Sequence, residues 1–380
     1  MITLVIRSGF FTQFDLSIIR KYDIHFLHGA FVGDRRLSDA SSFIRDVGSC
    51  CSSILFESDT VVVGSREGAI NSWSIETGKQ ILGLELDGPI SDLASSGDVL
   101  YTACSSNLVA IEISTGEVLW STQLEGSSDS VAIWDGFIWA LSSVYEIDIS
   151  DYTESTLWKF NSQGDLIERW SFAEKGWHMG VNNGIEIGIG RPSCGIIKVG
   201  RDGILNYHSL AVPSPVTIGC DGSETTIFGL SDGSICNSEG DLCGKASGLV
   251  TSIISIDDGW ASGDRNGRIL WGEKEIELDR EVLSLGVAPN GVDLWVQTWE
   301  DKSRFLSISP RGDYSQIFEH PDRIMVCDFK EEAIVFGDES GRVFLVEERY
   351  ENRFDQEDMK LGHREEERNL LKERLRRLRE

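Results

Sequence analysis

The residues from Val61 to Leu86, VVVGSREGAINSWSIETGKQILGLEL, form three short segments with strand character, separated by two turns. The first segment is β-branched and apolar, and the other two alternate apolar and polar side chains, which is the period of a half-buried strand. Gly68 and Gly78 lie in the two turns, where a tight hairpin needs a residue with positive φ. The stretch therefore predicts a meander of three antiparallel strands.

The same unit returns directly downstream at Val99–Leu124. One more short strand precedes each unit, Cys51–Phe56 before the first and Ile90–Ser95 before the second, so each repeat has four strands. The turns between the second and third strands recur roughly every 35 to 50 residues, and a period of this length built from short strands is the signature of a β-propeller.

Eight such repeats follow one another, which predicts an all-β fold of eight four-stranded antiparallel blades, with seven as the alternative if one repeat is misassigned. The third repeat is among the least regular. Its second strand is expected at Phe137–Leu141, with a turn near Ser142 and Ser143 and an insertion around Asp151–Thr156. The fourth repeat, with a strand at Ile185–Ile189, is the other weak assignment.

The eighth repeat ends without a fourth strand, because the composition changes abruptly at Glu347. A propeller must close its ring or leave exposed strand edges. We therefore expect Met1–Ile6 to pair with the last blade, whereas residues 29–46 are predicted to form a loop or a short helix. The predicted domains are a propeller over residues 1–346, in which residues 48–346 hold the repeats, and a charged tail over residues 347–380.

Acidic residues outnumber basic ones by 62 to 35, which gives a formal net charge of −27. A chain with this charge repels nucleic acid and anionic lipid. The charge indicates either an acidic surface for a basic partner or an adaptation of the surface to salt, and the even spread of the acids favours the second. No stretch is long and apolar enough for a membrane span, and the first residues do not resemble a signal peptide, so we expect a cytoplasmic protein.

The segment AIEISTGEVLW resembles the repeat of the pyrroloquinoline-quinone-type propellers, in Ala110, Glu112, Thr115, Gly116 and Trp120. The resemblance implies that this tryptophan docks between blades. The turns SDGSI, DRNGRI and DESGRV, at residues 231–235, 264–269 and 338–343, are similar to those of WD-repeat blades. Both resemblances imply the propeller architecture and leave the function open, because propellers have many unrelated roles.

Quinoprotein dehydrogenases share this repeat and often carry adjacent cysteines, as at Cys50 and Cys51. The calcium ligands and the catalytic aspartate that such enzymes need have no counterpart that we can place. No histidine pattern or cysteine spacing typical of a metal site is present either. The sequence therefore predicts no catalytic residue, no cofactor and no metal. His178, expected on a strand that lines the channel, is a candidate for contact with a channel ligand.

Residues 347–380 are highly charged, and EEERNLLKERLRRLRE (residues 365–380) predicts a helix with acids near its start and arginines near its end. Leu371, Leu375 and Leu378 form a narrow apolar stripe beside Leu370. A helix of this length is marginal on its own in water. We expect these four leucines to dock on a partner helix, on a second copy of the chain or on the acidic propeller, with a frayed tail as the alternative.

The sequence thus predicts a non-catalytic scaffold that binds protein partners through propeller faces and a C-terminal docking helix. The first alternative is an enzyme or small-ligand binder with its site at the mouth of the channel. Perturbed titratable side chains that converge on that mouth would favour this alternative. A second alternative is an assembly factor linked to export, which the lack of a recognisable signal peptide disfavours.

Overall fold

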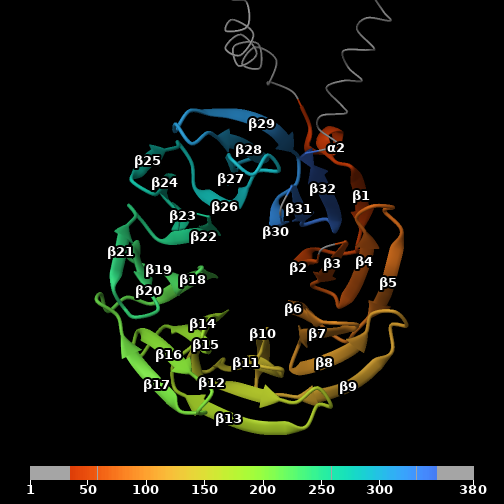
Figure 1. Ribbon diagram of the computed structural model, residues 1–380, viewed down its shortest axis with the longest axis vertical. Coiled ribbons are helices and arrows are strands. Elements are labelled where there is room, and N and C mark those ends of the chain that lie inside the picture. The colour runs from red at the N-terminus through yellow and green to blue at the C-terminus, as the bar shows by residue number, and fades with distance from the viewer. Residues whose placement is uncertain (1–34, 58, 258, 331, 349–380) are drawn as a thin grey trace, which may run out of the picture.

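The computed structural model describes residues 35–57, 59–257, 259–330 and 332–348. In these residues, eight four-stranded antiparallel sheets stand around a central channel, and the chain passes once around the ring (Figure 1). Each sheet is one blade, and its first strand lies next to the channel. The predicted propeller of eight blades is therefore confirmed, and the alternative with seven blades is wrong.

The first four blades follow one another without interruption. Their strands are β2 (Cys51–Phe56), β3 (Thr60–Ser65), β4 (Ala69–Ser74), β5 (Gln80–Glu85), β6 (Ile90–Ser96), β7 (Val99–Cys104), β8 (Asn107–Glu112), β9 (Val118–Gln123), β10 (Ser127–Trp134), β11 (Phe137–Glu146), β12 (Asp151–Phe160), β13 (Leu166–Phe172), β14 (Gly176–Val181), β15 (Ile185–Ile189), β16 (Gly195–Val199) and β17 (Leu205–Ser209).

The last four blades have the same order, except that the outermost strand of the eighth blade comes from the N-terminal part of the chain. Their strands are β18 (Val216–Asp221), β19 (Thr226–Leu230), β20 (Ser234–Asn237), β21 (Leu242–Lys245), β22 (Val250–Ile256), β23 (Gly259–Asp264), β24 (Arg268–Trp271), β25 (Lys274–Glu277), β26 (Val282–Val287), β27 (Leu294–Trp299), β28 (Ser303–Ile308), β29 (Tyr314–His320), β30 (Ile324–Lys330), β31 (Ala333–Asp338) and β32 (Arg342–Glu347).

Strand β1 (Phe43–Asp46) closes the ring by pairing antiparallel with β32, in the register Phe43 opposite Leu345. An N-terminal strand therefore completes the last blade, as expected, but it is β1 that occupies this place. The proposed strand Met1–Ile6 lies outside the described residues. The prediction for residues 29–46 was partly wrong: a short helix, α2 (Leu37–Ala40), is present, but β1 follows it. The strand has only four residues, too few for a clear alternation of apolar and polar side chains.

The segment before blade 1 also joins neighbouring blades. Leu37 and Ala40 of α2 are fully buried in an apolar cluster that includes Phe318 of blade 7 and Phe344 of blade 8. The Arg45 guanidinium donates to the carbonyl oxygen of Gly78 in blade 1, at 2.6 and 3.0 Å. Residues 35–46 therefore hold blades 7, 8 and 1 together.

The seams between blades depend on glycines in the second strand. At Gly229 a Cβ atom would lie 2.6 Å from Val250 Cγ1, because the first residue of the next blade packs directly against the bare backbone. The same approach occurs at three further seams, Gly64 against Ile90, Gly263 against Val282 and Gly337 against Cys51. These glycines allow the inner strands to come close enough to bury their apolar side chains.

A tryptophan docks across two of the outer seams. Trp120 Nε1 of blade 2 donates to the Ser162 carbonyl oxygen in blade 3, at 3.0 Å. Trp170 Nε1 of blade 3 donates in the same way to the Gly203 carbonyl oxygen in blade 4, at 3.1 Å. The role that the resemblance to the quinone-type repeat implied for Trp120 is therefore confirmed.

Candidate interaction surface

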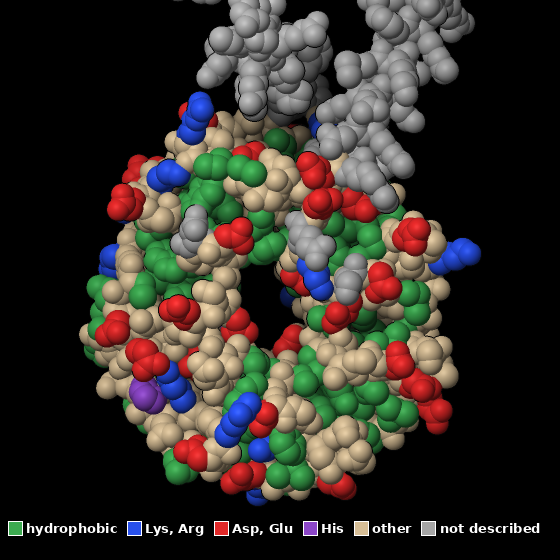
Figure 2. All heavy atoms as spheres, viewed as in Figure 1, with side chains coloured by type: hydrophobic (Ala, Val, Ile, Leu, Met, Phe, Trp, Pro, Cys, Tyr) green, Lys and Arg blue, Asp and Glu red, His purple; other side chains and the backbone are tan. Residues whose placement is uncertain are grey.

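The central channel is open in the space-filling view, and acidic side chains gather around its mouth on the face shown (Figure 2). Two of the carboxylates on the inner strands bridge neighbouring blades. Asp92 Oδ2 accepts a hydrogen bond from the Val131 amide, at 2.9 Å, and Asp328 Oδ2 accepts one from the Phe56 amide, at 3.1 Å. Burial raises the pKa of each of these aspartates to about 6.

A raised pKa is one of the features expected of a site at the channel mouth, and both aspartates have it. Their hydrogen bonds, however, give them a structural role. Each bonds to backbone amides of its own strand and of a neighbouring inner strand. Asp221 joins blades 4 and 5 across another seam, where its Oδ1 accepts from the Val181 amide at 3.0 Å. Perturbed carboxylates at these positions therefore follow from the way the blades are joined.

We expect Asp92→Asn to reduce the pH dependence of stability. Burial raises the pKa of Asp92 from 3.8 to about 6, so the folded protein binds this proton more tightly than the unfolded chain. The contribution is most favourable below pH 4 and is lost as the pH rises to about 6. As the pH rises from 4 to 6, the unfolding free energy of the variant should therefore rise by ~2 kcal/mol relative to that of the wild type. Urea unfolding at several pH values measures this.

A matched control for that experiment is Asp98→Asn, because the carboxyl group of Asp98 is exposed in the following turn. If the two variants show the same pH profile, the burial of Asp92 does not govern the effect.

His178 lies in the seam between blades 4 and 5. Its ring makes an edge contact with Phe228, with centroids 6.0 Å apart, and packs so closely on Gly219 that a Cβ there would lie 2.5 Å from the ring. Burial lowers the pKa of His178 to about 4, so the ring is neutral near pH 7. Nε2 is buried without a hydrogen-bond partner. This packing favours a structural role for His178 over contact with a channel ligand.

Among the described residues, one group has ligand atoms close enough to hold a metal ion: His320, Asp322 and Asp338, with atoms within 4.8 Å of one another. Arg342 already supplies positive charge to the cluster, because its guanidinium contacts both aspartates. Asp338 Oδ2 lies 2.9 Å from His320 Nε2. Asp338 Oδ1 accepts from the amides of Ser340 and Arg342, at 2.9 and 2.8 Å.

The pKa of Asp338 fits a permanently ionised anchor for this turn. Burial opposes its ionisation, but the hydrogen bonds from His320, Ser340 and Arg342 outweigh that effect and hold the pKa below its ordinary value. A metal ion would have to displace the guanidinium that supplies the positive charge. The cluster therefore joins the end of β29 to the turn after β31 and does not fit a metal site.

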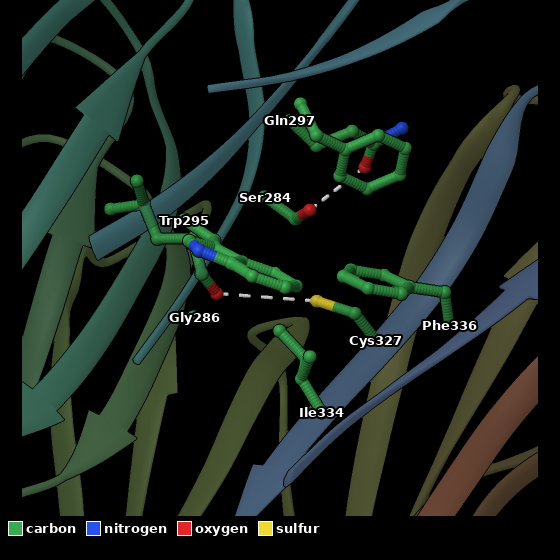
Figure 3. A pocket seen from close by; sticks show the side chains of 9 residues that line it. Ser284, Gly286, Trp295, Gln297, Cys327, Ile334 and Phe336 are labelled. Carbon is green, nitrogen blue, oxygen red and sulfur yellow. Dashed lines mark hydrogen bonds between the residues drawn. The ribbon is translucent and has the colours of Figure 1, made fainter. Parts of the chain in front are cut away.

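Another candidate for a ligand site is the region between blades 7 and 8, where Trp295, Cys327, Ile334 and Phe336 meet (Figure 3). Its polar members bond to one another: Ser284 Oγ donates to Gln297 Oε1 at 2.8 Å. The side chains leave no space for even a water molecule. This region is a packed seam and not a ligand pocket.

Blade 3 carries the most distinctive surface feature. Its middle strands, β11 and β12, have ten residues each, whereas β7 and β8 in blade 2 have six. The four extra residues carry the hairpin roughly 13 Å further along the strand direction. Residues 144–154 are called the blade-3 hairpin below.

The turn predicted near Ser142 and Ser143 was wrong. Ser142 and Ser143 lie inside β11, the turn is formed by residues 147–150, and the expected insertion at Asp151–Thr156 is part of β12. The serines are buried, and Ser143 Oγ is bound by the Lys175 ammonium at 2.7 Å. Polar residues suggested a turn, but here Ser143 accepts from the buried Lys175 and Ser142 accepts from Trp158 Nε1.

The tip of the blade-3 hairpin exposes large apolar side chains. Ile147 is 82% exposed, Ile149 is 59% exposed and Tyr145 is 50% exposed. Tyr145 pairs across the hairpin with Tyr152, with ring centroids 5.1 Å apart, and Tyr152 contacts Trp177 of blade 4 at 5.9 Å. Rings from two blades, Tyr145, Tyr152 and Trp177, thus form one aromatic surface at the base of the turn that carries Ile147 and Ile149.

The buried side chain of Lys175 packs against two of these rings. Its ammonium lies 4.6 Å from the ring centroid of Tyr152 and 5.7 Å from that of Trp177. It also forms an ion pair with Asp129, at 2.5 Å. The buried charge is therefore paired, and the two rings are held against the body of the propeller.

This surface was not predicted from the sequence. The available signal was the alternation in YEIDIS, residues 145–150, which continues the period of a strand beyond the expected turn. The predicted docking residues Leu370, Leu371, Leu375 and Leu378 lie outside the described residues, as does the predicted tail helix.

The comparisons with known proteins agree with this architecture. Residues 46–137 match the family described as "Outer membrane protein assembly factor BamB". The crystal structure of Sqt1 from Saccharomyces cerevisiae is similar, with a TM-score of 0.65 at 12% identity, covering 81% of this chain and 98% of that one. The computationally designed Ika8 protein has a TM-score of 0.63 at 15% identity, covering 80% and 98%.

No curated protein matches the sequence. None of the helices in the described part of the chain is long and apolar enough to cross a membrane. The family match spans blades 1 and 2 and the inner strand of blade 3, so it ends before the blade-3 hairpin. The protein is an eight-bladed β-propeller with repeats similar to those of the BamB-like, pyrroloquinoline-quinone-type propellers.

Proposed function

We propose that this protein is a non-catalytic, cytoplasmic scaffold that binds a protein partner through the blade-3 hairpin. The exposed apolar surface of Tyr145, Ile147, Ile149 and Trp177 is the observation that carries the proposal. Exposed aromatic and aliphatic side chains that lie together are typical of protein interfaces. A propeller suits this role, because its rigid blades hold projecting turns in fixed positions.

The alternative of an enzyme or small-ligand binder at the channel mouth has less support. Its strongest candidates, Asp92, Asp328 and His178, are engaged in the seams between blades. The tail over residues 347–380, with its expected helix, remains part of the proposal as a second docking element. The export-linked alternative draws on the family match, which covers residues 46–137 and does not include the hairpin.

We expect the double variant Ile147→Ser and Ile149→Ser to lose the partner without loss of stability, because both side chains are exposed at a turn. Immobilised wild-type and variant proteins would be compared for proteins captured from the native host, by quantitative mass spectrometry. Loss of about tenfold in capture would fit the removal of two apolar contacts at an interface.

A matched control is the double variant Ile204→Ser and Val292→Ser, which removes apolar side chains of similar exposure, 57% and 56%, from other blades. A chain ending at Glu348 tests the tail separately. If capture is lost only with the shortened chain, the tail and not the hairpin is the docking element, and the proposal for the hairpin is wrong.

A further inference from the structure

Acidic side chains alternate with the apolar ones on the blade-3 hairpin. Glu146 and Asp148 flank Ile147, and Asp151 follows the turn, and all three are exposed. No ion pair involves these three acids within the described residues. The surface that a partner must cover therefore carries uncompensated negative charge.

The charge around the hairpin has the same sign over a long part of the chain. From Gln80 to Trp158 the sequence contains 13 Asp and Glu residues and no Lys or Arg. These residues make up blade 2 and most of blade 3. In the described part of the chain, three of these acids, Glu125, Asp129 and Asp135, are matched by cations from blades 3 and 4, and the acids of the hairpin are not. Electrostatic complementarity at the hairpin therefore favours basic side chains on the partner.

The aromatic rings of the same surface suit such side chains. On the inner side, Tyr152 and Trp177 already hold the Lys175 ammonium. The rings of Tyr145 and Trp177 remain about half exposed, at 50% and 48%. Lysine and arginine bind favourably over aromatic faces while their aliphatic stems cover apolar surface.

We infer that the blade-3 hairpin binds a basic peptide segment of a partner protein, in which Lys or Arg residues are interspersed with apolar ones. The apolar residues of the segment cover Ile147 and Ile149, and its cations face Glu146, Asp148 and Asp151. This inference rests on the proposed function and specifies its partner. A second copy of this chain does not fit, because two such hairpins would bring like charges together.

A direct test uses a labelled peptide of lysine and leucine, LKKLLKLLKKLLKL, with its glutamate and glutamine counterparts, in fluorescence anisotropy against the full-length protein. Two variants address the site: Ile147→Ser with Ile149→Ser, and Glu146→Gln with Asp148→Asn and Asp151→Asn. The control, Asp241→Asn with Glu273→Gln and Asp313→Asn, removes the same charge from exposed positions in other blades.

The lysine peptide should bind more tightly than the other two, and each hairpin variant should weaken it by about tenfold, whereas the control should change affinity by less than about twofold. Equal weakening by the control would mean general attraction to an acidic protein and would overturn the inference. So would equal binding of the glutamate peptide.

The outcomes also separate this inference from the proposed function. If the hairpin variants lose the host partner but bind the lysine peptide as the wild type does, the docking surface stands and the partner class is wrong. If they keep both the host partner and the peptide, both proposals are wrong. Formation of a dimer that the apolar hairpin variant abolishes, measured by light scattering, would identify a second copy as the occupant.

Discussion

Asp338→Ala is expected to lower the free energy of unfolding by about 3–5 kcal/mol, the range for removing one partner from a buried ion pair. The carboxylate is fully buried. Without it, His320 Nε2, the Arg342 guanidinium and the amides of the turn at Ser340 lose their shared acceptor. Equilibrium unfolding in urea measures the loss.

The control is Glu339→Gln, which changes the charge of the adjacent residue in the same turn. Glu339 is exposed, and its carboxylate accepts only a long hydrogen bond from the Arg323 amide, at 3.3 Å. We expect less than about 1 kcal/mol for this change. A similar small loss for Asp338→Ala would contradict the role of Asp338 as the anchor of the turn.

Gly229→Ala is expected to cost about 3 kcal/mol, because the new methyl group has no space. Its Cβ would lie 2.6 Å from Val250 Cγ1 and 2.7 Å from Val250 Cβ, so blades 5 and 6 must move apart. Gly97→Ala is the matched control: nothing lies within 4 Å of its Cβ, but its φ is +58°. The control should cost only the ~1 kcal/mol of placing alanine in the left-handed region.

A double-mutant cycle with Val250→Ala separates this clash from a general loss of packing. Val250 is fully buried, so its truncation alone is destabilising. Together with Gly229→Ala, the truncation removes the contact with Cγ1 at 2.6 Å but keeps the Cβ atom at 2.7 Å, so the combined loss should be smaller than the sum by part of the clash energy. A strictly additive result would show that the two side chains do not clash.

The strands of the regular blades could be predicted because local and global signals agree there. β2 begins and ends at the predicted residues Cys51 and Phe56, and even in the weakly assigned fourth repeat β15 does so at Ile185 and Ile189. Both are short apolar or alternating runs bounded by turn residues. In such a repeat, the hydrophobic period, the glycine turns and the return of the unit all indicate the same strands.

Two features could not be predicted, because long-range contacts determine them. β1 forms a strand only because the free edge of β32 pairs with it, and the sequence FIRD carries too short a pattern to show this. The predicted blade-3 hairpin is too short, because two adjacent serines, Ser142 and Ser143, are typical of a turn. Their hydroxyls are buried inside the sheet, where Trp158 Nε1 donates to Ser142 Oγ at 2.9 Å and Lys175 donates to Ser143 Oγ.

The candidate site could not be predicted for the same reason, because it lies where the chain departs from the repeat. The seams are built from repeated elements, and the resemblance to the quinone-type repeat implied the docking of Trp120 across one of them, whereas the blade-3 hairpin is an exception to the repeat. Nothing in the period of the other blades predicts that Trp177 of blade 4 lies beside Tyr152 of blade 3. Such a contact depends on the angle between blades, which the packing of whole sheets determines.

The closure of the ring by β1 has a consequence for synthesis on the ribosome. Ser42 donates to the Leu345 carbonyl oxygen across 303 positions of the chain, so the segment that seals the propeller is made long before its partner. Blades 1 to 7 can complete their sheets as they emerge, but the last sheet must wait for a strand from the start of the chain. Until these two segments meet, β32 exposes a free edge that neighbouring nascent chains can pair with.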